Sequence, residues 1–304
     1  MFAIETKNVS FSYSSKRKVV NDVSLEVPEQ SIYGFLGPNG AGKTTTIRLL
    51  TAMLLSNADN IFIEGKSIAK HRIEIFKTVG TLIETPSLYL HLTGEENLKI
   101  ITTLRNIHPK VIQEILSVVG LSHAAKMKVK QYSLGMKQRL GIGMALLPDP
   151  QLLILDEPAN GLDPNGIIEI RELLVKLNKE HGKTIFVSSH LLSEVEKMST
   201  HIGIIHKGIM RYQGTLQNMK DTAYATGEVI FKIPNATDYL LSVQQDFPQV
   251  KQISNDEVLF HFVNQNEVTA INKQLVNKNI PVAGIQIKGG LEEWFMQIID
   301  KNNN

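Results

Sequence analysis

The sequence contains no cysteine among its 304 residues. A chain without thiols forms no disulfide bonds and offers no thiolate to a metal ion, which agrees with a reducing compartment such as the cytoplasm. Excess charge of one sign is also lacking, because 32 lysine and arginine residues face 30 aspartate and glutamate residues. The formal net charge of +2 therefore gives no reason to expect a nucleic-acid partner.

Long apolar runs are missing too. No stretch approaches the roughly 20 apolar residues that a membrane-spanning helix needs, and the most apolar region, from Leu140 to Leu155, is interrupted by Pro148, Asp149 and Pro150. The first residues lack the basic start and the apolar stretch of a signal peptide. If the protein works at a membrane, we expect a separate chain to supply the spans.

A phosphate-binding loop follows the apolar run from Ile32 to Leu36. Its sequence fills every fixed position of the pattern G-x-x-x-x-G-K-[ST], and an amphipathic helix pattern comes next. This context argues against the simpler interpretation, a glycine-rich turn with a chance lysine. The loop consists of Gly37, Pro38, Asn39, Gly40, Ala41, Gly42, Lys43, Thr44 and Thr45.

The residue types in the loop suit the binding of a nucleotide. Gly40 and Gly42 let the backbone bend so that successive N–H groups converge on phosphate oxygens, and the positive end of the following helix dipole points at them. We expect Lys43 to reach the β- and γ-phosphates and the hydroxyl of Thr44 to coordinate Mg²⁺. The sequence therefore predicts a nucleotide site that uses Mg²⁺.

Two carboxylates end a second buried strand. The run from Leu152 to Leu155 is unbroken by polar residues, as expected for a parallel strand covered on both faces. Asp156 and Glu157 follow directly, at the end of the strand where a phosphate-loop protein holds its nucleotide. We expect Asp156 to hold Mg²⁺ and Glu157 to polarise the attacking water, the plainer alternative being an acidic junction between a strand and a turn.

The first two thirds of the chain alternate apolar runs with helical patterns, which predicts an α/β fold with a mostly parallel sheet and helices on both faces. Residues 94–123 show helical periodicity alone, and the alternating run from Val19 to Val27 predicts one half-buried strand. Further strands are predicted at 32–36, 61–66, 79–84, 152–155, 184–188 and 202–206, and helices at 167–180 and 191–198.

A separate unit begins where the apolar periodicity weakens, around residues 215–226. The order that follows is strand, helix, strand, strand, helix, strand and a terminal helix, which resembles a split βαβ, ferredoxin-like α+β module. We therefore expect two domains, 1–218 and 219–304. Trp294 and Phe295 either line the pocket of a small-molecule sensor or pack in a core, which is the commoner role of such residues.

Three further motifs complete a set of five. With the phosphate loop and the Asp156-Glu157 strand, they resemble the ATPase subunits of ABC transporters over residues 2 to about 215. The family's signature reads L-S-G-G-Q, from which this chain departs in its first, third and fifth residues. The three motifs are Tyr132, Ser133, Leu134, Gly135 and Met136; Asn160, Gly161, Leu162, Asp163 and Pro164; and Ser188, Ser189 and His190.

The resemblance implies a fold and a set of partners. The fold is a P-loop NTPase core with a mostly parallel sheet, an antiparallel β subdomain and an α-helical insertion at about 94–145. The ligands are ATP and Mg²⁺, bound at the interface of a head-to-tail dimer of two copies of the chain. The remaining partner is an integral membrane permease, which places the chain at the cytoplasmic face of the cell membrane.

The resemblance also assigns roles to single residues. Tyr13 lies where the family has an aromatic ring that stacks on adenine, although aromatic residues in such strands are usually part of the core. His190 matches the histidine that contacts the γ-phosphate, whereas on sequence alone it would equally well cap a helix. Ser133 and Gly135 match residues that act on the nucleotide of the second subunit, and Asp163 belongs to the loop that crosses the dimer interface.

Glu84 departs from the family in a chemically meaningful way. After the strand at 79–83 the family normally has a glutamine, whose amide senses Mg²⁺ and the attacking water beside the contact with the permease. A carboxylate adds negative charge near the metal and removes an amide donor, so metal affinity and coupling should both change. This glutamate and the extended C-terminal region are similar to the exporters of the bacitracin and lantibiotic-immunity branch.

These observations favour the ATP-hydrolysing subunit of an exporter that confers resistance or immunity to antimicrobial peptides. The alternative is a soluble, non-transport ATPase of the same superfamily that acts on ribosomes or nucleic acid. Ribosomal relatives usually carry two ATPase cassettes in one chain and DNA-repair relatives a long coiled-coil insertion, and this chain has neither.

Overall fold

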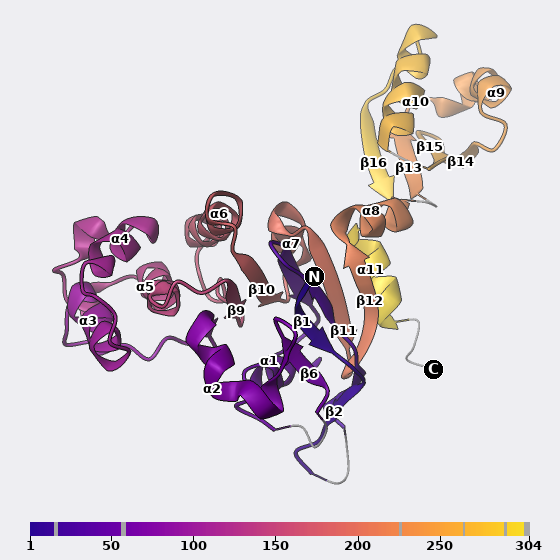
Figure 1. The fold of residues 1–304 in the computed structure, drawn as a ribbon. Helices are drawn as coiled ribbons and strands as arrows, with labels where there is room; N and C mark the ends of the chain where they lie inside the picture. Colours follow the sequence, from indigo (N-terminus) through magenta and orange to yellow (C-terminus); the bar gives the residue numbers. More distant parts are fainter. Residues whose placement is uncertain (15–17, 56–58, 225–226, 264, 289–290, 301–304) are drawn as a thin grey trace. The chain divides into compact units, whose positions relative to one another are not determined.

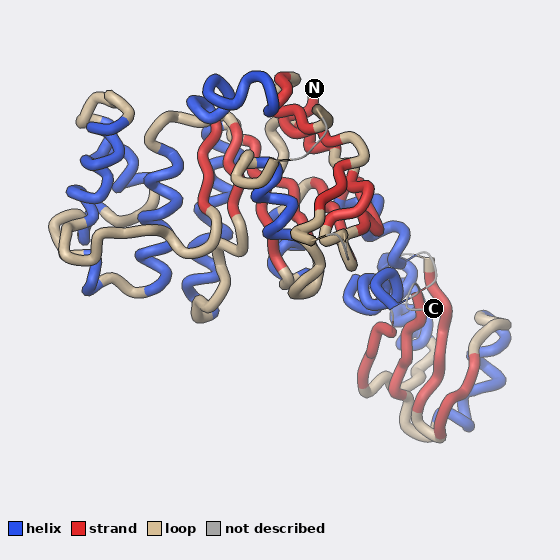
Figure 2. Tube along the Cα trace, turned by 90° about the horizontal axis from the view of Figure 1, so that it is seen from below, coloured by secondary structure: helices blue, strands red, loops and turns tan. Residues whose placement is uncertain are grey.

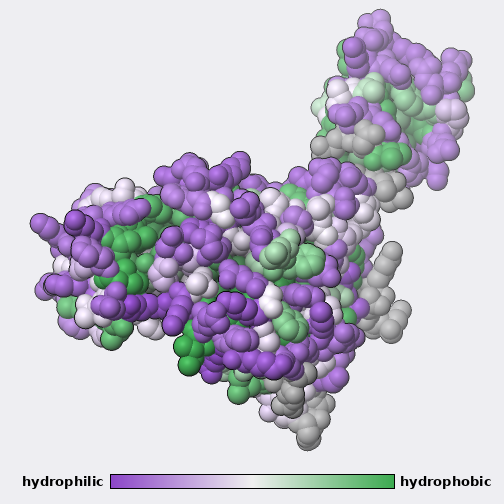
Figure 3. Space-filling model, in the orientation of Figure 1, coloured by the Kyte–Doolittle hydropathy of each residue, from purple (hydrophilic) through white to green (hydrophobic). Residues whose placement is uncertain are grey.

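The computed structural model describes residues 1–14, 18–55, 59–224, 227–263, 265–288 and 291–300 (Figure 1). The chain divides into two compact units, Met1–Gly214 and Thr215–Asn304. Within the described ranges, no helix is both long enough and apolar enough to cross a bilayer. Hydrophilic residues cover most of the face of the first unit that Figure 3 shows.

A six-stranded sheet forms the centre of the first unit, with the strand order β12-β11-β5-β10-β9-β8. Four neighbouring pairs run parallel: β5 with β10, β5 with β11, β9 with β10, and β8 with β9. The sequence prediction of a mostly parallel sheet agrees with these pairs. The strands are β5 (Ile32–Leu36), β8 (Val79–Leu82), β9 (Leu152–Leu155), β10 (Thr184–Ser189), β11 (His201–His206) and β12 (Ile209–Thr215).

Alternate side chains of the central strands enter two separate hydrophobic cores. In β9, for example, Leu153 packs in one core and Ile154 in the other, and Val187 and Phe186 of β10 are divided in the same way. Both faces of the sheet are therefore covered, as the unbroken apolar run in β9 indicates. The covering helices include α1 (Lys43–Leu50), α6 (Pro164–His181) and α7 (Leu192–Met198).

The N-terminal strands form smaller antiparallel sheets. One has the order β4-β1-β6-β7, and the other consists of β2 and β3. These strands are β1 (Phe2–Thr6), β2 (Val9–Phe11), β3 (Val20–Val23), β4 (Glu26–Pro28), β6 (Ile61–Ile63) and β7 (Lys66–Ser67).

The prediction of one strand from Val19 to Val27 is wrong. The run contains two strands that belong to different sheets, since β3 pairs with β2 and β4 pairs with β1. Asp22 has a φ of 59° and bonds through Oδ1 to the side chain of Asn8. This left-handed residue lies inside β3 and breaks the simple alternation there, whereas Ser24 and Leu25 separate β3 from β4.

Helices α3, α4 and α5 lie together, as both Figure 1 and Figure 2 show. The entry to α3 is a capping box, in which Thr93 Oγ1 accepts from the N–H of Glu96 and the Glu96 carboxylate accepts from the N–H of Thr93. From the sequence, no helix or strand is predicted at residues 68–78, where the structure has helix α2. This helix buries only Ile68 and Ile75, so its sequence shows no clear apolar face. These helices are α2 (Ile68–Thr78), α3 (Gly94–Leu104), α4 (Val111–Val118) and α5 (Leu134–Leu146), with short 3₁₀ turns η1 (Ser122–Ala124) and η2 (Val129–Gln131).

The second unit contains a four-stranded sheet in the order β14-β15-β13-β16, and each neighbouring pair is antiparallel. Val229 and Phe231 of β13 form a core with side chains of α9 and α10, such as Val243 and Leu275. The elements are α8 (Leu216–Tyr224), β13 (Gly227–Lys232), α9 (Ala236–Asp246), β14 (Lys251–Ser254), β15 (Glu257–Phe262), α10 (Gln265–Asn277), β16 (Gly284–Lys288) and α11 (Leu291–Asp300).

The close approach of α7 to the central sheet predicts the effect of a single methyl group. A Cβ at Gly34 of β5 would lie 2.1 Å from Cγ1 of Val195 in α7. We expect Gly34→Ala to lower the free energy of unfolding by about 1–3 kcal/mol, because overpacking forces the helix off the sheet. Denaturation followed by circular dichroism measures the change.

Gly284→Ala is the matched control. The nearest atom to a Cβ at Gly284 is 3.6 Å away, an ordinary contact, so its unfolding free energy should stay within about 0.5 kcal/mol of the unmodified value. Equal stability of the Gly34 and Gly284 variants would contradict the packing described here.

Candidate nucleotide-binding site

Three neighbouring parallel strands, β5, β10 and β9, end at one edge of the central sheet. The register aligns Leu36 with Ser189 and Leu155 with Val187, so the polar segments that follow these strands meet. This edge, at the carboxyl ends of the strands, is where open α/β sheets bind ligands. It brings together the phosphate loop, the Asp156-Glu157 pair and His190.

The phosphate loop adopts a conformation that requires glycine. Gly40 and Gly42 have φ values of 76° and 110°, in the left-handed region that L side chains rarely adopt. A Cβ at Gly37 would lie 2.4 Å from the carbonyl oxygen of Ile205. Helix α1 begins at Lys43, immediately after this turn, so its positive dipole end faces the loop.

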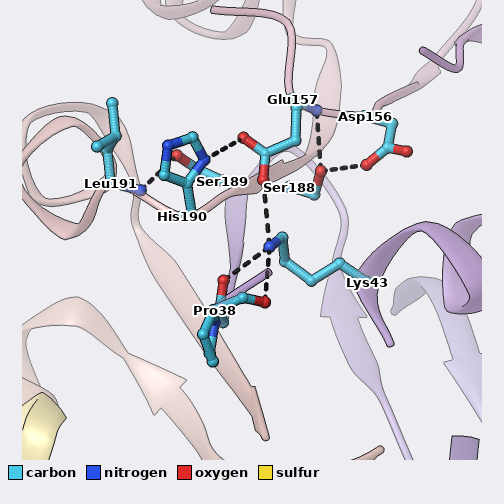
Figure 4. Close-up of polar contacts among 9 residues, drawn as sticks. Pro38, Lys43, Asp156, Glu157, Ser188, Ser189, His190 and Leu191 are labelled. Atoms are coloured by element: carbon cyan, nitrogen blue, oxygen red, sulfur yellow. Dashed lines mark hydrogen bonds and ion pairs between the residues drawn. The ribbon is translucent and has the colours of Figure 1, made fainter. Parts of the chain in front are cut away.

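The Lys43 ammonium group is buried, with 6% of the side chain exposed. It donates to the carbonyl oxygens of Gly37 at 2.7 Å and Pro38 at 3.3 Å, and it lies 3.2 Å from Oε1 of Glu157 (Figure 4). A buried cation needs such partners, because its desolvation would otherwise be costly.

Glu157 connects Lys43 to His190. Its second oxygen, Oε2, lies 2.8 Å from Nδ1 of His190. Figure 4 shows the carboxylate between the two basic side chains. The backbone of Glu157 has a φ of 48°, an uncommon conformation for a residue other than glycine. The residue expected to polarise water therefore has a strained backbone conformation.

Ser188 holds the two acidic residues in register. Its hydroxyl donates to Oδ1 of Asp156 at 2.5 Å and accepts from the N–H of Glu157 at 2.9 Å. Ser188 is fully buried, and Asp156 is only 3% exposed. The Asp156 carboxylate is therefore oriented by a neighbouring strand.

These residues surround a cavity of about 380 Å³. Its volume lies within the range typical of small-molecule sites. The lining contains an ammonium group, an imidazole, a carboxylate and threonine hydroxyls, which suits the oxygens of a polyphosphate. The lining residues are Val19, Asn39, Gly40, Gly42, Lys43, Thr44, Thr45, Glu157, Asn160 and His190.

Tyr13 lies beside the phosphate loop without lining this cavity. Its hydroxyl is 3.4 Å from Oγ1 of Thr45, and its ring makes an edge contact with Phe11 at 5.0 Å between centroids. The side chain is 56% exposed, so the aromatic face remains accessible for stacking. The alternative in which Tyr13 is a core residue does not fit this exposure.

Ser133, Gly135 and Asp163 lie outside the cavity, at the starts of two helices. Ser133 caps α5 by accepting from the N–H of Met136, and Asp163 caps α6 by accepting from the N–H of Gly166. Gly135 lies beside the turn that precedes α6. The two motifs thus form one surface.

Glu84 faces Arg48 of helix α1, with which its carboxylate forms an ion pair. Glu84 follows strand β8 in a left-handed conformation, with a φ of 62°. Hydrogen bonding to Tyr13 and then to Glu84 raises the pKa of Arg48 above its usual range. The structure therefore groups Glu84 with Tyr13 and Arg48 rather than with the lining of the cavity.

From the sequence alone, no individual role is assigned to three contributors: Ser188 and Asn160, which are named only within motifs, and Arg48, which is not named. Ser188 could be found from topology, since adjacent parallel strands bring their carboxyl ends together. Arg48 follows Thr44 by four residues, so helical spacing places both on one face of α1. Arg48 and Glu84 are 36 residues apart in the sequence, so no local sequence pattern predicts their contact.

The buried position of Ser188 predicts a loss of stability on its removal. Ser188→Ala leaves the N–H of Glu157 and the carboxylate of Asp156 each without a partner, so the unfolding free energy should fall by about 1–3 kcal/mol. Ser189→Ala is the control, because its hydroxyl accepts an exposed bond from Leu191 and its loss should cost about 0.5 kcal/mol or less. Thermal and denaturant unfolding compare the two, and equal stabilities would argue against the role of Ser188.

Comparisons with solved structures agree with this fold. The ATP-binding subunit of an ABC transporter superposes with a TM-score of 0.63 and 29% identity, over 72% of this chain and 92% of the other. An ATP-binding cassette solved as a dimer, in a post-hydrolysis state bound to ADP and phosphate, gives a TM-score of 0.63 and 24% identity, over 70% of this chain and 98% of that one. The second likeness supports the fold alone.

Curated relatives extend over nearly the whole chain. The bacitracin transport ATP-binding protein BcrA of Bacillus licheniformis is 40% identical over 299 residues, which cover 97% of each chain. The protein of the same name from Enterococcus faecalis is 37% identical, over 98% of this chain and 96% of its own. The lantibiotic transport ATP-binding protein SrtF of Streptococcus pyogenes is 42% identical, over 67% of this chain and 87% of its own.

The model of the ABC transporter family matches residues 20–160. The relatives are transport ATP-binding proteins, so the alternative of a non-transport ATPase is not favoured. The resemblance drawn from the five motifs, including that to the bacitracin and lantibiotic branch, is confirmed. The chain belongs to the ATP-binding subunits of ABC transporters, the ATPases that power transport.

Proposed function

We propose that this chain is the ATPase subunit of an exporter that removes antimicrobial peptides of the bacitracin or lantibiotic type and so confers resistance or immunity. The likeness to bacitracin transport ATP-binding proteins over 97% of both chains carries this proposal, because it includes the second unit as well as the motor. A separate membrane permease would supply the pathway, with the present chain at the cytoplasmic face of the membrane.

In the proposed reaction, water attacks the γ-phosphorus, the bond to the β-phosphate bridging oxygen breaks, and ADP and phosphate form. Glu157 orients the water and accepts its proton, while Lys43 and His190 contact the phosphoryl oxygens. Both basic groups lie within 3.2 Å of the Glu157 carboxylate, so phosphate oxygens can take over these contacts. Such positioning and charge stabilisation account for most catalysis of phosphoryl transfer.

Mg²⁺ fits the oxygen donors at the site. Thr44 lines the cavity, and Asp156 presents a carboxylate whose orientation Ser188 fixes. Magnesium is usually held by one or two such groups together with phosphates. The ion would supply positive charge to the β- and γ-phosphates when bound. Glu84 pairs with Arg48 outside the lining of the cavity, so its charge would alter metal affinity from beside the site.

The dimer would complete each site. We assign Ser133 and Gly135 to the nucleotide held by the phosphate loop of the second copy, with Asp163 in the loop that links the two sites. Tyr13 would stack on the adenine of its own copy. The shared surface of the α5 and α6 starts supports this assignment, because both motifs would approach the partner together.

The two units would divide the work. We assign residues 1–218 to the ABC-type ATP-binding domain, with its helical insertion at about 94–145, and 219–304 to an accessory domain. The strand order β14-β15-β13-β16, with antiparallel neighbours, supports a ferredoxin-like fold for the accessory domain. Residue Phe295 is partly buried, in keeping with packing rather than an open pocket.

Glu157→Gln tests the chemistry. The amide keeps the size of the side chain but accepts no proton, so ATP turnover should fall at least about 100-fold while ATP still binds. Phosphate release measures turnover, calorimetry measures binding, and size-exclusion chromatography in ATP should detect an accumulated dimer. Glu180→Gln, on an exposed part of α6, is the control. Turnover near the unmodified rate would remove Glu157 from its role.

The exporter function is tested in cells that lack this chain. They should become more sensitive to bacitracin or to a lantibiotic, and expression of the unmodified chain should restore growth. Lys43→Ala should fail to do so, because the phosphates lose their buried cation. Unchanged sensitivity to both classes would contradict the substrate assignment. If the chain is purified from native membranes together with ribosomal proteins and without a membrane-spanning protein, that result would contradict the expected association with a permease.

A further inference from the structure

Four side chains from three segments meet beside the nucleotide site. Tyr13 follows strand β2, Thr45 and Arg48 belong to helix α1, and Glu84 follows strand β8. The Tyr13 hydroxyl lies 3.4 Å from Oγ1 of Thr45, and Arg48 forms an ion pair with Glu84. Thr45 also lines the cavity, so this group connects the nucleotide site with the residue after β8.

Arg48 is built onto the helix that carries the phosphate loop. It lies three residues after Thr45 and four after Thr44, so all three project from the same side of α1. The helix therefore places a guanidinium group one turn from the proposed metal ligand. A planar guanidinium suits a carboxylate better than an ammonium group does, because its N–H groups match both carboxylate oxygens.

The negative charge of Glu84 lies near the site proposed to bind ATP. ATP is an anion, and an unbalanced carboxylate near its binding site would repel it. Glu84 brings such a charge to a position where a neutral amide would bring none. Its φ of 62° also shows that the chain adopts an unfavourable backbone conformation there.

We propose that Arg48 is a positioning residue that holds the Glu84 carboxylate and balances its charge at the edge of the nucleotide site. The inference rests on the proposed function in one respect, the use of this cavity for ATP. It adds that Glu84 and Arg48 act as a unit, in which Arg48 matters for ATP binding only while the Glu84 carboxylate is present.

A simple stabilising ion pair would not explain the arrangement. The Arg48 side chain is 34% exposed and that of Glu84 is 58% exposed, so water screens their attraction. Pairs of this kind contribute little to folding. The effect of Arg48 should therefore appear in ligand binding and not in the stability of the fold.

The test is a double-mutant cycle read by ATP affinity in a chelator of divalent metals at low salt. Arg48→Ala should weaken ATP binding about two- to five-fold, the size expected for a partly screened charge. Glu84→Gln should bind ATP at least as well as the unmodified chain. The double variant should return to within about two-fold of the unmodified affinity, because no charge is left to balance.

Three controls keep the result specific. Arg48→Lys retains the charge and should bind nearly as well as the unmodified chain. Lys179→Ala removes an exposed positive charge from α6 and should have no effect. The loss in Arg48→Ala should shrink at high salt, since ions screen the uncompensated carboxylate. A KM for Mg·ATP that rises with little change in kcat would agree with a role in binding.

Two outcomes would overturn the proposal. One is equal affinity of Arg48→Ala and the unmodified chain at low salt. The other is a loss that persists in the Glu84→Gln background, which would make Arg48 act on the nucleotide independently of Glu84. Failure of the unmodified chain to bind ATP would instead contradict the site itself, so the two kinds of failure are distinguishable.

Discussion

The ion pair between buried Lys43 and Glu157 is the interaction on which the site depends. A buried ammonium group needs polar partners, because its desolvation is otherwise costly, and the Glu157 carboxylate supplies one of them beside two carbonyl oxygens. Lys43 comes from the loop after β5 and Glu157 from the end of β9, with β10 between these strands. The phosphate loop therefore holds its shape only if the central sheet is correctly assembled.

The two hydrophobic cores enforce that assembly. Neighbouring residues of a strand enter opposite cores, so a slip of one position would move Leu153 and Ile154 to the wrong faces. The same slip would displace Asp156 from Ser188 and Glu157 from Lys43. Packing energy spread over the sheet thus fixes the geometry of a few polar atoms at its edge.

Sequence reasoning succeeds where one segment carries the whole signal. The phosphate loop needs glycine for its backbone and lysine for its charge, and both requirements are local. Sequence reasoning fails where contacts with distant segments determine the structure, as in the run from Val19 to Val27, which divides between two sheets. It also misses α2, because this helix buries too few apolar residues to show an apolar face. The roles of Ser188 and Arg48 depend likewise on contacts between strands or between a helix and a loop.

The capping bonds at α5 and α6 limit what those helix starts can offer a second copy of the chain. Ser133 uses an oxygen lone pair to accept from Met136, but its hydroxyl hydrogen remains available to donate to a phosphate oxygen. Asp163 only accepts when ionised, and an anion close to phosphate is repelled. In the proposed dimer, Ser133 would therefore contact the phosphate directly, whereas Asp163 would orient the start of α6. The Ser133 hydroxyl would act on the nucleotide held by the other copy of the chain.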